Sequence, residues 1–196
     1  RGQFMIYKNI FKRIFDIAFS AFLIFLLILP SLFIALIIKI VSRGPVIHWS
    51  NRVGKNNVVF KMPKFRSMNI NTPTNIPTNL FKNPKAHIYP FGNFLRKTSL
   101  DEIPQLISIL KGEMSFVGPR PYTPSEIADY KLSYWKKRHL VKPGITGLSQ
   151  IFLNGRNGKN YSRICLDVVY VRNHSLSLDM YILFHTFLKL IRGSSF

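Results

Sequence analysis

The chain contains one continuous apolar stretch, residues 17–38, which reads IAFSAFLIFLLILPSLFIALII. These 22 residues carry no charge and are interrupted only by Ser20, Pro30 and Ser31. As one straight helix they would span about 33 Å at ~1.5 Å per residue, which is enough to cross a bilayer. The stretch therefore predicts a membrane segment within residues 1–43, followed by a separate domain over residues 44–196.

The flanks and the proline indicate how this segment meets the membrane. Because cytoplasmic flanks are rich in Lys and Arg, both ends are expected on the cytoplasmic side. Pro30 lacks a backbone N–H and clashes with the carbonyl four residues earlier, so it kinks or breaks a helix. A re-entrant hairpin bent at Pro30 satisfies both flanks, and we favour it. A kinked helix that spans the bilayer stays the alternative, because membrane helices tolerate proline. The basic flanking residues are Lys8, Lys12, Arg13, Lys39, Arg43, Arg52 and Lys55.

The composition combines a large positive charge with a high apolar content. The 196 residues include 28 Lys and Arg against 8 Asp and Glu, a formal charge of +20, and 47% are hydrophobic. That apolar content excludes a wholly unfolded polycation. The single cysteine, Cys165, excludes an internal disulfide framework. The charge predicts an anionic partner, which could be nucleic acid, an acidic membrane surface or a phosphorylated substrate.

Residues beyond the apolar stretch predict an α/β domain that is mostly helical with short strands. Residues 46–49 and 58–62 have β-type composition, and residues 103–111 predict a short helix stopped by Gly112. Residues 178–191 predict an amphipathic helix, which packs in the core or lies in the bilayer interface. Its apolar stripe consists of Met180, Leu183, Phe184, Phe187 and Ile191.

Asp101 and Glu102 are the only adjacent pair among the eight acidic residues. One interpretation is a helix capping box, with Ser99 as the N-cap and Glu102 three residues later. Pro104 disfavours it, because a helix starting at Ser99 would need the missing N–H, whereas a start near Asp101 would not. Both carboxylates would then lie at a helix N-terminus, where the dipole keeps a carboxylate ionised as a nucleophile requires. Two such oxygen ligands also suit Mg²⁺.

Arg120 lies between two prolines in the sequence GPRP, residues 118–121. Prolines on both sides fix the backbone, so the guanidinium is preorganised for bidentate phosphate recognition. A surface arginine in a proline-rich turn is the default alternative. Lys64, Arg66 and Arg96 are further candidates for phosphate binding, although most such charges are simply solvated.

Taken in order, these segments resemble the bacterial sugar transferase family, the monotopic phosphoglycosyl transferases that start membrane glycoconjugate assembly. The overall size is similar to that of the small single-domain members. The resemblance rests on FKRIFD at 11–16, KFRSM at 64–68, LR at 95–96, TSLDEIPQL at 98–106, KGEMSFVGPRP at 111–121, PGITG at 143–147, NGRN at 154–157, and Leu166, Asp167 and Tyr170.

The resemblance implies a ping-pong transfer in which Asp101 attacks the β-phosphorus of a UDP-sugar, expels UMP and forms an aspartyl-phosphosugar intermediate. Polyprenol phosphate would then take the phosphosugar. Glu102 would assist through Mg²⁺ or proton handling, and Asp101 and Glu102 together would be the metal ligands. The substrate and phosphate ligands would be Arg120, Lys64, Arg66, Arg96 and Asp167.

The resemblance also implies a location and partners. The hairpin bent at Pro30 would hold a cytosolic catalytic domain, with interfacial amphipathic helices, on the cytoplasmic face of the bacterial inner membrane. Anionic lipid is the expected surface, and self-association or association with downstream glycosyltransferases is a further expectation. Two other functions compete: a membrane-tethered nucleic-acid-binding protein, which +20 favours but no recognised motif supports, and an inactive scaffold of a glycan-assembly complex.

Overall fold

The computed structural model describes residues 10–72, 87–129, 132–153 and 160–192, so the NGRN segment at 154–157 lies outside the described residues. The described chain is mostly helical with short strands, which confirms this part of the predicted fold class. Its helices and strands follow the order α2 (Lys12–Val41), β1 (Ile47–Val53), η2 (Lys55–Asn57), β2 (Val59–Phe65), α3 (Pro90–Lys97), η5 (Leu100–Glu102), α4 (Gln105–Lys111), β3 (Ser115–Val117), η6 (Pro124–Asp129), α5 (Leu132–Arg138), β4 (Gly144–Thr146), α6 (Leu148–Phe152), α7 (Asn160–Asn173) and α8 (Leu176–Ile191).

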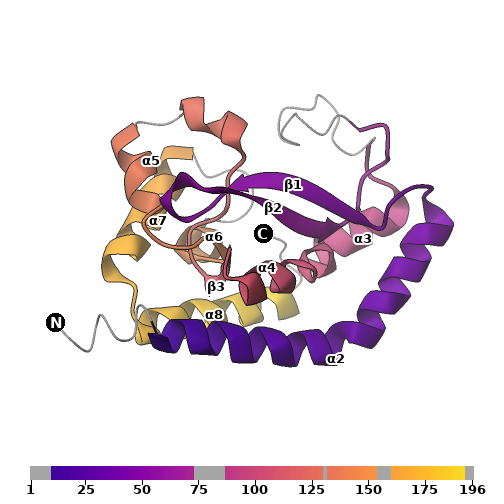
Figure 1. The fold of residues 1–196 in the computed structure, drawn as a ribbon, viewed down its shortest axis with the longest axis horizontal. Coiled ribbons are helices and arrows are strands. Elements are labelled where there is room, and N and C mark those ends of the chain that lie inside the picture. Colours follow the sequence, from indigo (N-terminus) through magenta and orange to yellow (C-terminus); the bar gives the residue numbers. More distant parts are fainter. Residues whose placement is uncertain (1–9, 73–86, 130–131, 154–159, 193–196) are drawn as a thin grey trace.

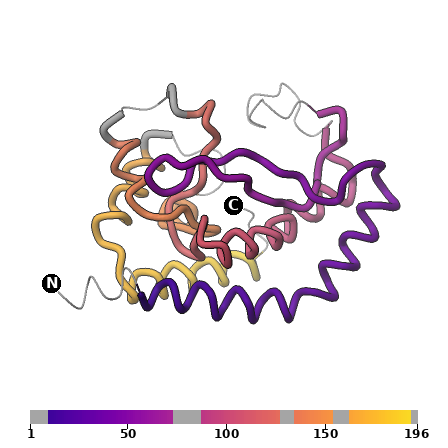
Figure 2. The backbone as a smooth tube through the Cα atoms, viewed as in Figure 1, coloured from indigo at the N-terminus to yellow at the C-terminus, as the bar shows by residue number. Residues whose placement is uncertain are grey.

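The long helix α2 contains the whole apolar stretch and remains one helix through Pro30. It runs along one edge of the molecule and then changes direction, and Figure 2 shows that the backbone stays continuous through the bend. The loss of the proline N–H and the clash of its ring account for such a bend. The structure thus has a single bent helix that contains Pro30, and the re-entrant hairpin stays a prediction.

Most of α2 is exposed to the surroundings of the protein. Among the described residues, α2 is the one helix long and apolar enough to cross a membrane by length and composition, and only 11% of its most apolar window is buried. Phe25 is 81% exposed and Leu29 is 74% exposed. A surface this apolar is unfavourable in water. The prediction of a membrane-associated segment therefore agrees with the structure.

The other side of α2 packs against the domain. Phe19, Leu23 and Leu27 in its first half contact the main core, which includes the buried Ile109 and Ile182. In its second half, Ile34 and Ile38 join a second cluster with Phe65 and Leu95.

Polar contacts also fix the first half of α2. The Asp16 carboxylate accepts hydrogen bonds from the Ser115 hydroxyl at 3.0 Å and from the Phe116 backbone N–H at 3.1 Å. Lys12 forms an ion pair with Asp179 of α8, and Figure 1 shows α2 and α8 lying along the same edge of the molecule. The helix is therefore a structural part of the domain as well as its apolar extension.

The strands form two small sheets that face the helices. Strands β1 and β2 are antiparallel, with Ile47 opposite Phe65 and Val53 opposite Val59. Strands β3 and β4 are parallel, with Val117 opposite Thr146. The β1–β2 hairpin lies on the side of α4 and β3 that is opposite to α2 and α8 (Figure 1).

Helix α8 exposes most of the apolar stripe that the sequence predicts, and its buried side lies elsewhere on the helix. Its inner face carries Ile182, which is fully buried in the main core. On its outer face, Phe184 is 60% exposed, Phe187 is 59% exposed and Ile191 is 67% exposed. Helix α8 itself lies along the edge of the molecule that α2 also occupies (Figure 1).

Candidate active site

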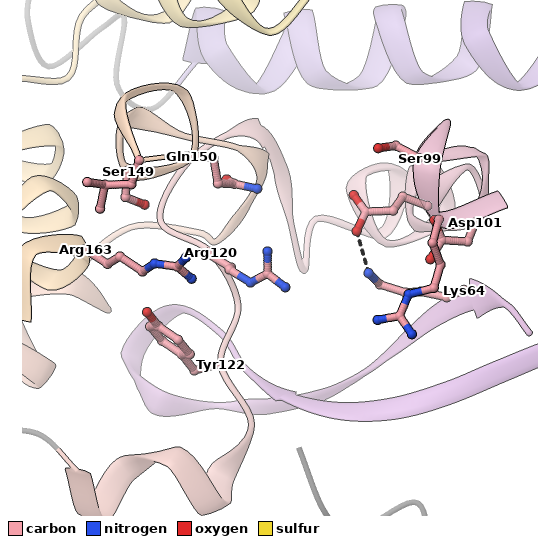
Figure 3. A pocket seen from close by; sticks show the side chains of 11 residues that line it. Lys64, Ser99, Asp101, Arg120, Tyr122, Ser149, Gln150 and Arg163 are labelled. Atoms are coloured by element: carbon pink, nitrogen blue, oxygen red, sulfur yellow. Dashed lines mark hydrogen bonds and ion pairs between the residues drawn. The ribbon is translucent and has the colours of Figure 1, made fainter. Parts of the chain in front are cut away.

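A polar pocket forms where β2, η5, the segment after β3, α6 and α7 meet. In Figure 3, Arg120 lies between Asp101 and Lys64 on one side and Ser149 and Arg163 on the other. Four cationic and two anionic side chains line this pocket, so its charge suits a ligand with several negative charges. The lining residues are Lys64, Arg96, Ser99, Asp101, Glu102, Arg120, Tyr122, Ser149, Gln150, Leu153 and Arg163.

Asp101 lies on a tight turn that precedes α4. Ser99 begins the turn with a left-handed backbone (φ 57°) and its side chain caps no helix, so the capping-box interpretation is wrong. Helix α4 starts at Gln105, later than the predicted start near Asp101, and both carboxylates lie in the separate turn η5. Pro104 directly precedes α4, where its missing N–H costs no hydrogen bond. Gly112 ends α4 with φ 86°, which agrees with the prediction.

The Asp101 carboxyl group is almost fully buried, with 8% of the residue exposed. Burial raises its pKa to about 6, and the neighbouring Glu102 also raises it, whereas Lys64 and Arg96 lower it. The sequence predicted that a helix dipole would keep this carboxylate ionised, but desolvation has the larger effect. Asp101 is therefore mainly ionised at neutral pH and protonated in mild acid.

Glu102 has the opposite electrostatic environment. Its Oε1 accepts a hydrogen bond from Lys64 Nζ at 2.5 Å, the contact drawn as a dashed line in Figure 3. Burial acts to raise the pKa of Glu102, but the charge and hydrogen bond of Lys64, together with Arg120, lower it overall. The adjacent carboxyl groups thus have pKa values that are moved in opposite directions, an arrangement typical of acid–base and nucleophilic sites.

The backbone that carries Arg120 is held as the flanking prolines predict. The Gly118 N–H donates to Thr146 O at 2.9 Å, and the Gly144 N–H donates to Pro119 O at 3.0 Å. The two segments approach so closely that a Cβ at Gly144 would lie 2.1 Å from the Gly118 nitrogen, so glycine is required there. The PGITG segment, residues 143–147, therefore holds the backbone of the GPRP segment, residues 118–121, through these hydrogen bonds.

Arg52 shows how strongly positive the surroundings of Arg120 are. Its guanidinium donates to Pro121 O at 3.3 Å, the carbonyl of the second proline. Burial and the like charge of Arg120 lower the pKa of Arg52 to about 10. An anion bound at Arg120 would relieve this repulsion, which favours phosphate as the ligand.

Three of the four predicted cationic ligands, Lys64, Arg96 and Arg120, line the pocket, but Arg66 does not. Arg66 is 5% exposed and donates to Ser42 O and Arg43 O, both at 2.6 Å. These carbonyls follow the last turn of α2, so Arg66 caps the end of that helix.

Asp167 also lies outside the lining of the pocket. It is 1% exposed in α7, forms an ion pair with Arg138 at 2.6 Å and accepts a hydrogen bond from Ser149 at 2.8 Å. Both carboxylate oxygens of Asp167 therefore bind protein side chains.

Several lining residues were missed by sequence reasoning, chiefly Arg163, Tyr122, Ser149 and Gln150. Arg163 lies one turn into α7, beyond the NGRN segment, and only the high local density of polar residues hinted at it. Tyr122 directly follows the GPRP segment, so the same fixed backbone that positions Arg120 also positions its ring.

Asp101 and Glu102 are the two carboxylates that could hold a metal ion in this pocket. The described residues contain no group of three or more His, Cys, Asp and Glu side chains arranged to bind a metal. Mg²⁺ is commonly held by one or two carboxylates together with phosphate oxygens of the substrate. The pair therefore fits a cation that binds together with a diphosphate.

Comparison with known proteins gives the family of the chain. Residues 7–193 match the family model described as bacterial sugar transferase. The UDP-glucose:undecaprenyl-phosphate glucose-1-phosphate transferases of Klebsiella pneumoniae and Escherichia coli K12 are 40% and 42% identical over 92% and 93% of this chain. The chain spans 40% of the length of each of these two relatives. The exopolysaccharide production protein PSS of Rhizobium leguminosarum bv. phaseoli is 39% identical over 95% of this chain and 98% of its own length.

Proposed function

Because the chain belongs to the bacterial sugar transferase family, we propose that it transfers a sugar phosphate from a UDP-sugar to undecaprenyl phosphate. The products would be undecaprenyl-diphosphate-sugar and UMP. This would be the first membrane step in assembling a glycoconjugate such as a glycoprotein, O-antigen, capsule or exopolysaccharide. The names of the Klebsiella and Escherichia relatives make UDP-glucose the first donor to test.

The observation that carries this proposal is a buried carboxyl group facing a cluster of cations. Asp101 has a pKa of about 6, so at neutral pH it is a carboxylate that has lost much of its hydration. Lys64, Arg96, Arg120 and Arg163 line the same pocket. A nucleophilic carboxylate beside fixed positive charges is the arrangement that phosphoryl transfer requires.

In the first half-reaction, a carboxylate oxygen of Asp101 attacks the β-phosphorus of the UDP-sugar. The bond between that phosphorus and the bridging oxygen breaks, and UMP leaves with the electron pair. An aspartyl-phosphosugar remains on the enzyme. Nucleophile and leaving group must lie roughly in line, so UMP leaves away from Asp101, towards Arg120 and Arg163 in Figure 3.

In the second half-reaction, a phosphate oxygen of undecaprenyl phosphate attacks the same phosphorus and displaces the Asp101 carboxylate. Neither step needs a net proton transfer if both phosphates arrive ionised, so Glu102 has no obligatory role as a base. Its ion pair with Lys64 instead keeps two opposite charges fixed beside the reacting group. Arg120 stabilises the charge that develops on the transferred phosphoryl oxygens.

Mg²⁺ would be held by Asp101 and Glu102 together with the diphosphate of the donor. Once bound, it would neutralise charge on the diphosphate and on the leaving UMP.

The acceptor places the enzyme at a membrane, and α2 and α8 supply the surface for it. We propose that the exposed apolar residues of α2 enter the bilayer as a re-entrant segment bent at Pro30, and that α8 lies in the interface. Both charged flanks of α2 would then face the cytoplasm, which places the pocket on the cytoplasmic face of the bacterial inner membrane.

A UMP-release assay tests this function directly. The purified chain in phospholipid nanodiscs would be incubated with undecaprenyl phosphate, Mg²⁺ and a panel of UDP-sugars, with the Asp101→Asn variant as the matched control. We expect UMP release with at least one donor. Without acceptor, a ping-pong enzyme releases a burst of UMP equal to the amount of active protein. If no donor yields UMP, the proposed function is wrong.

A further inference from the structure

A buried ion pair connects two walls of the pocket. Arg138 Nη2 donates to the Arg120 carbonyl oxygen at 2.7 Å and to Asp167 Oδ2 at 2.6 Å. The other carboxylate oxygen of Asp167 accepts a hydrogen bond from the Ser149 hydroxyl at 2.8 Å. A single chain of hydrogen bonds therefore runs from Arg120 through Arg138 and Asp167 to Ser149.

The two ends of this chain lie in different parts of the fold. Arg120 follows β3, whereas Ser149 lies in α6, and both residues line the pocket. The two middle residues, Arg138 and Asp167, are each 1% exposed. Neither of them lines the pocket, so they act on a ligand through other residues.

Arg138 also fixes the ring of Tyr122. Its guanidinium carbon lies 4.2 Å from the centroid of that ring and 5.6 Å from the centroid of the Trp135 ring. Within the described residues, Nε and Nη1 of Arg138 make no hydrogen bond, so these aromatic faces supply much of the remaining stabilisation of the cation. Tyr122 lines the pocket beside Arg120.

A buried pair of this kind is an unfavourable way to gain stability alone, because both ions lose their hydration. Some such pairs are retained because they fix a geometry, and this one contacts a carbonyl, a ring and a hydroxyl at one pocket.

We propose that Arg138 and Asp167 form a positioning pair, which holds the Arg120 segment and Ser149 at the spacing needed to bind the phosphate groups of the substrate. The proposal rests on the proposed function for the identity of the substrate. It replaces the expected role of Asp167 as a direct ligand with an indirect one. It also gives a function to Arg138, which was not among the predicted site residues.

A double-mutant cycle between Asp167 and Arg120 tests this pair. Asp167→Asn keeps the shape of the side chain and an acceptor for Ser149, but removes the charge that holds Arg138. Arg120→Met removes the guanidinium that the pair is proposed to position. Affinity for inorganic pyrophosphate, measured by calorimetry on the full chain in nanodiscs, is the primary readout, and kcat/KM for UMP release is the second.

We expect Asp167→Asn to weaken pyrophosphate binding about tenfold in the wild-type background and less than twofold in the Arg120→Met background. The proposal would be overturned if Asp167→Asn weakened pyrophosphate binding by the same factor in both backgrounds, or had no effect in either. Asn173→Ala, an exposed position on the same helix, is the matched control and should leave the affinity unchanged.

Asp167→Asn leaves Arg138 as an unpaired buried charge and could unfold the chain. The double variant Asp167→Asn/Arg138→Gln avoids this, because neither residue is then charged. We expect it to fold and still bind pyrophosphate about tenfold more weakly; wild-type affinity in the folded double variant would overturn the proposal. Pyrophosphate binding is measured without turnover, so this result is separable from a wild-type chain that releases no UMP, which would count against the proposed function alone.

Discussion

Lys64 Nζ lies 2.5 Å from Glu102 Oε1, beside the almost fully buried carboxyl group of Asp101. The contact lowers the pKa of Glu102, while burial raises that of Asp101 to about 6. The pKa values of these two neighbouring carboxyl groups are therefore moved in opposite directions. Glu102 stays ionised as the partner of Lys64, and Asp101 becomes a nucleophile only when it loses its proton.

The first prediction concerns the pH dependence of the reaction. The kcat/KM for UMP release should fall below pH about 6, because Asp101 becomes protonated there. Lys64 lowers the pKa of both carboxyl groups, so Lys64→Met should move this acidic limb to higher pH and lower the maximum. Lys61→Met, on the same strand and outside the pocket, is the control. An acidic limb that stays in place in Lys64→Met would contradict the assignment.

The second prediction concerns stability and follows from the same pKa. A carboxyl group whose pKa is higher in the folded than in the unfolded state favours folding at low pH, and this contribution is lost as pH rises through about 6. At pH 8 the buried Asp101 carboxylate should therefore cost roughly 3 kcal/mol. Asp101→Asn should abolish UMP release yet raise the melting temperature at pH 8, with little difference at pH 4. A lower melting temperature of the variant at pH 8 would contradict this prediction.

Much of the site could be predicted where a local pattern determines the backbone. Pro104 limits where α4 can start, and Gly112 ends it, so the position of Asp101 before a helix followed from the sequence. The prolines around Arg120 likewise indicated a fixed arginine. The apolar residues 17–38 predicted a long helix of membrane type because the signal is continuous.

The roles of other charged residues depend on contacts between distant segments, which no local pattern contains. Arg66 lies two residues from Lys64 in the sequence, yet it caps the end of α2 instead of entering the pocket. Asp167 pairs with Arg138, which is 29 residues earlier. The raised pKa of Asp101 was not predicted, because the helix dipole could be inferred from the sequence and the desolvation could not.

The third prediction concerns the hydrogen bonds that connect Asp16 of α2 to β3, the strand that precedes Arg120. Asp16→Ala leaves the buried Ser115 hydroxyl and Phe116 N–H without their acceptor, at a cost of about 1–3 kcal/mol. We expect a lower melting temperature and reduced UMP release, while association with membranes persists through the apolar part of α2. Asp16→Asn retains an acceptor oxygen and should keep most of the activity. Equal activity of Asp16→Ala and the wild type would show that these hydrogen bonds do not affect the site.

The fourth prediction concerns Phe184 and Phe187, two exposed aromatic residues of α8. Burying one Phe side chain in an apolar phase stabilises membrane binding by about 1.5–3 kcal/mol. The double variant Phe184→Ser/Phe187→Ser should therefore bind the membrane more weakly. UMP release with undecaprenyl phosphate in vesicles should fall about tenfold or more, while binding of UMP should not change. Val58→Ser/Val59→Ser is the matched control, because these side chains are 66% and 52% exposed on the β1–β2 hairpin. If both double variants behave alike, α8 does not dock on the lipid surface.

The fifth prediction concerns the bend of α2. Pro30→Ala restores a backbone N–H that can donate to the carbonyl of Leu26, so a straight helix becomes more favourable than a bent one.

In a Cys165→Ser background, a cysteine placed at residue 1 reports the side of the membrane on which the N-terminus lies. For the bent helix, we expect an impermeant thiol reagent to label it only from the cytoplasmic side, as it should label a cysteine at exposed Asn173. Straightening should add labelling from the periplasmic side for residue 1 alone. It would detach the first half of α2 from the domain and break the contacts of Asp16 and Lys12, whereas α8 and the pocket stay with the folded domain. Periplasmic labelling of residue 1 when Pro30 is intact would mean that α2 spans the bilayer.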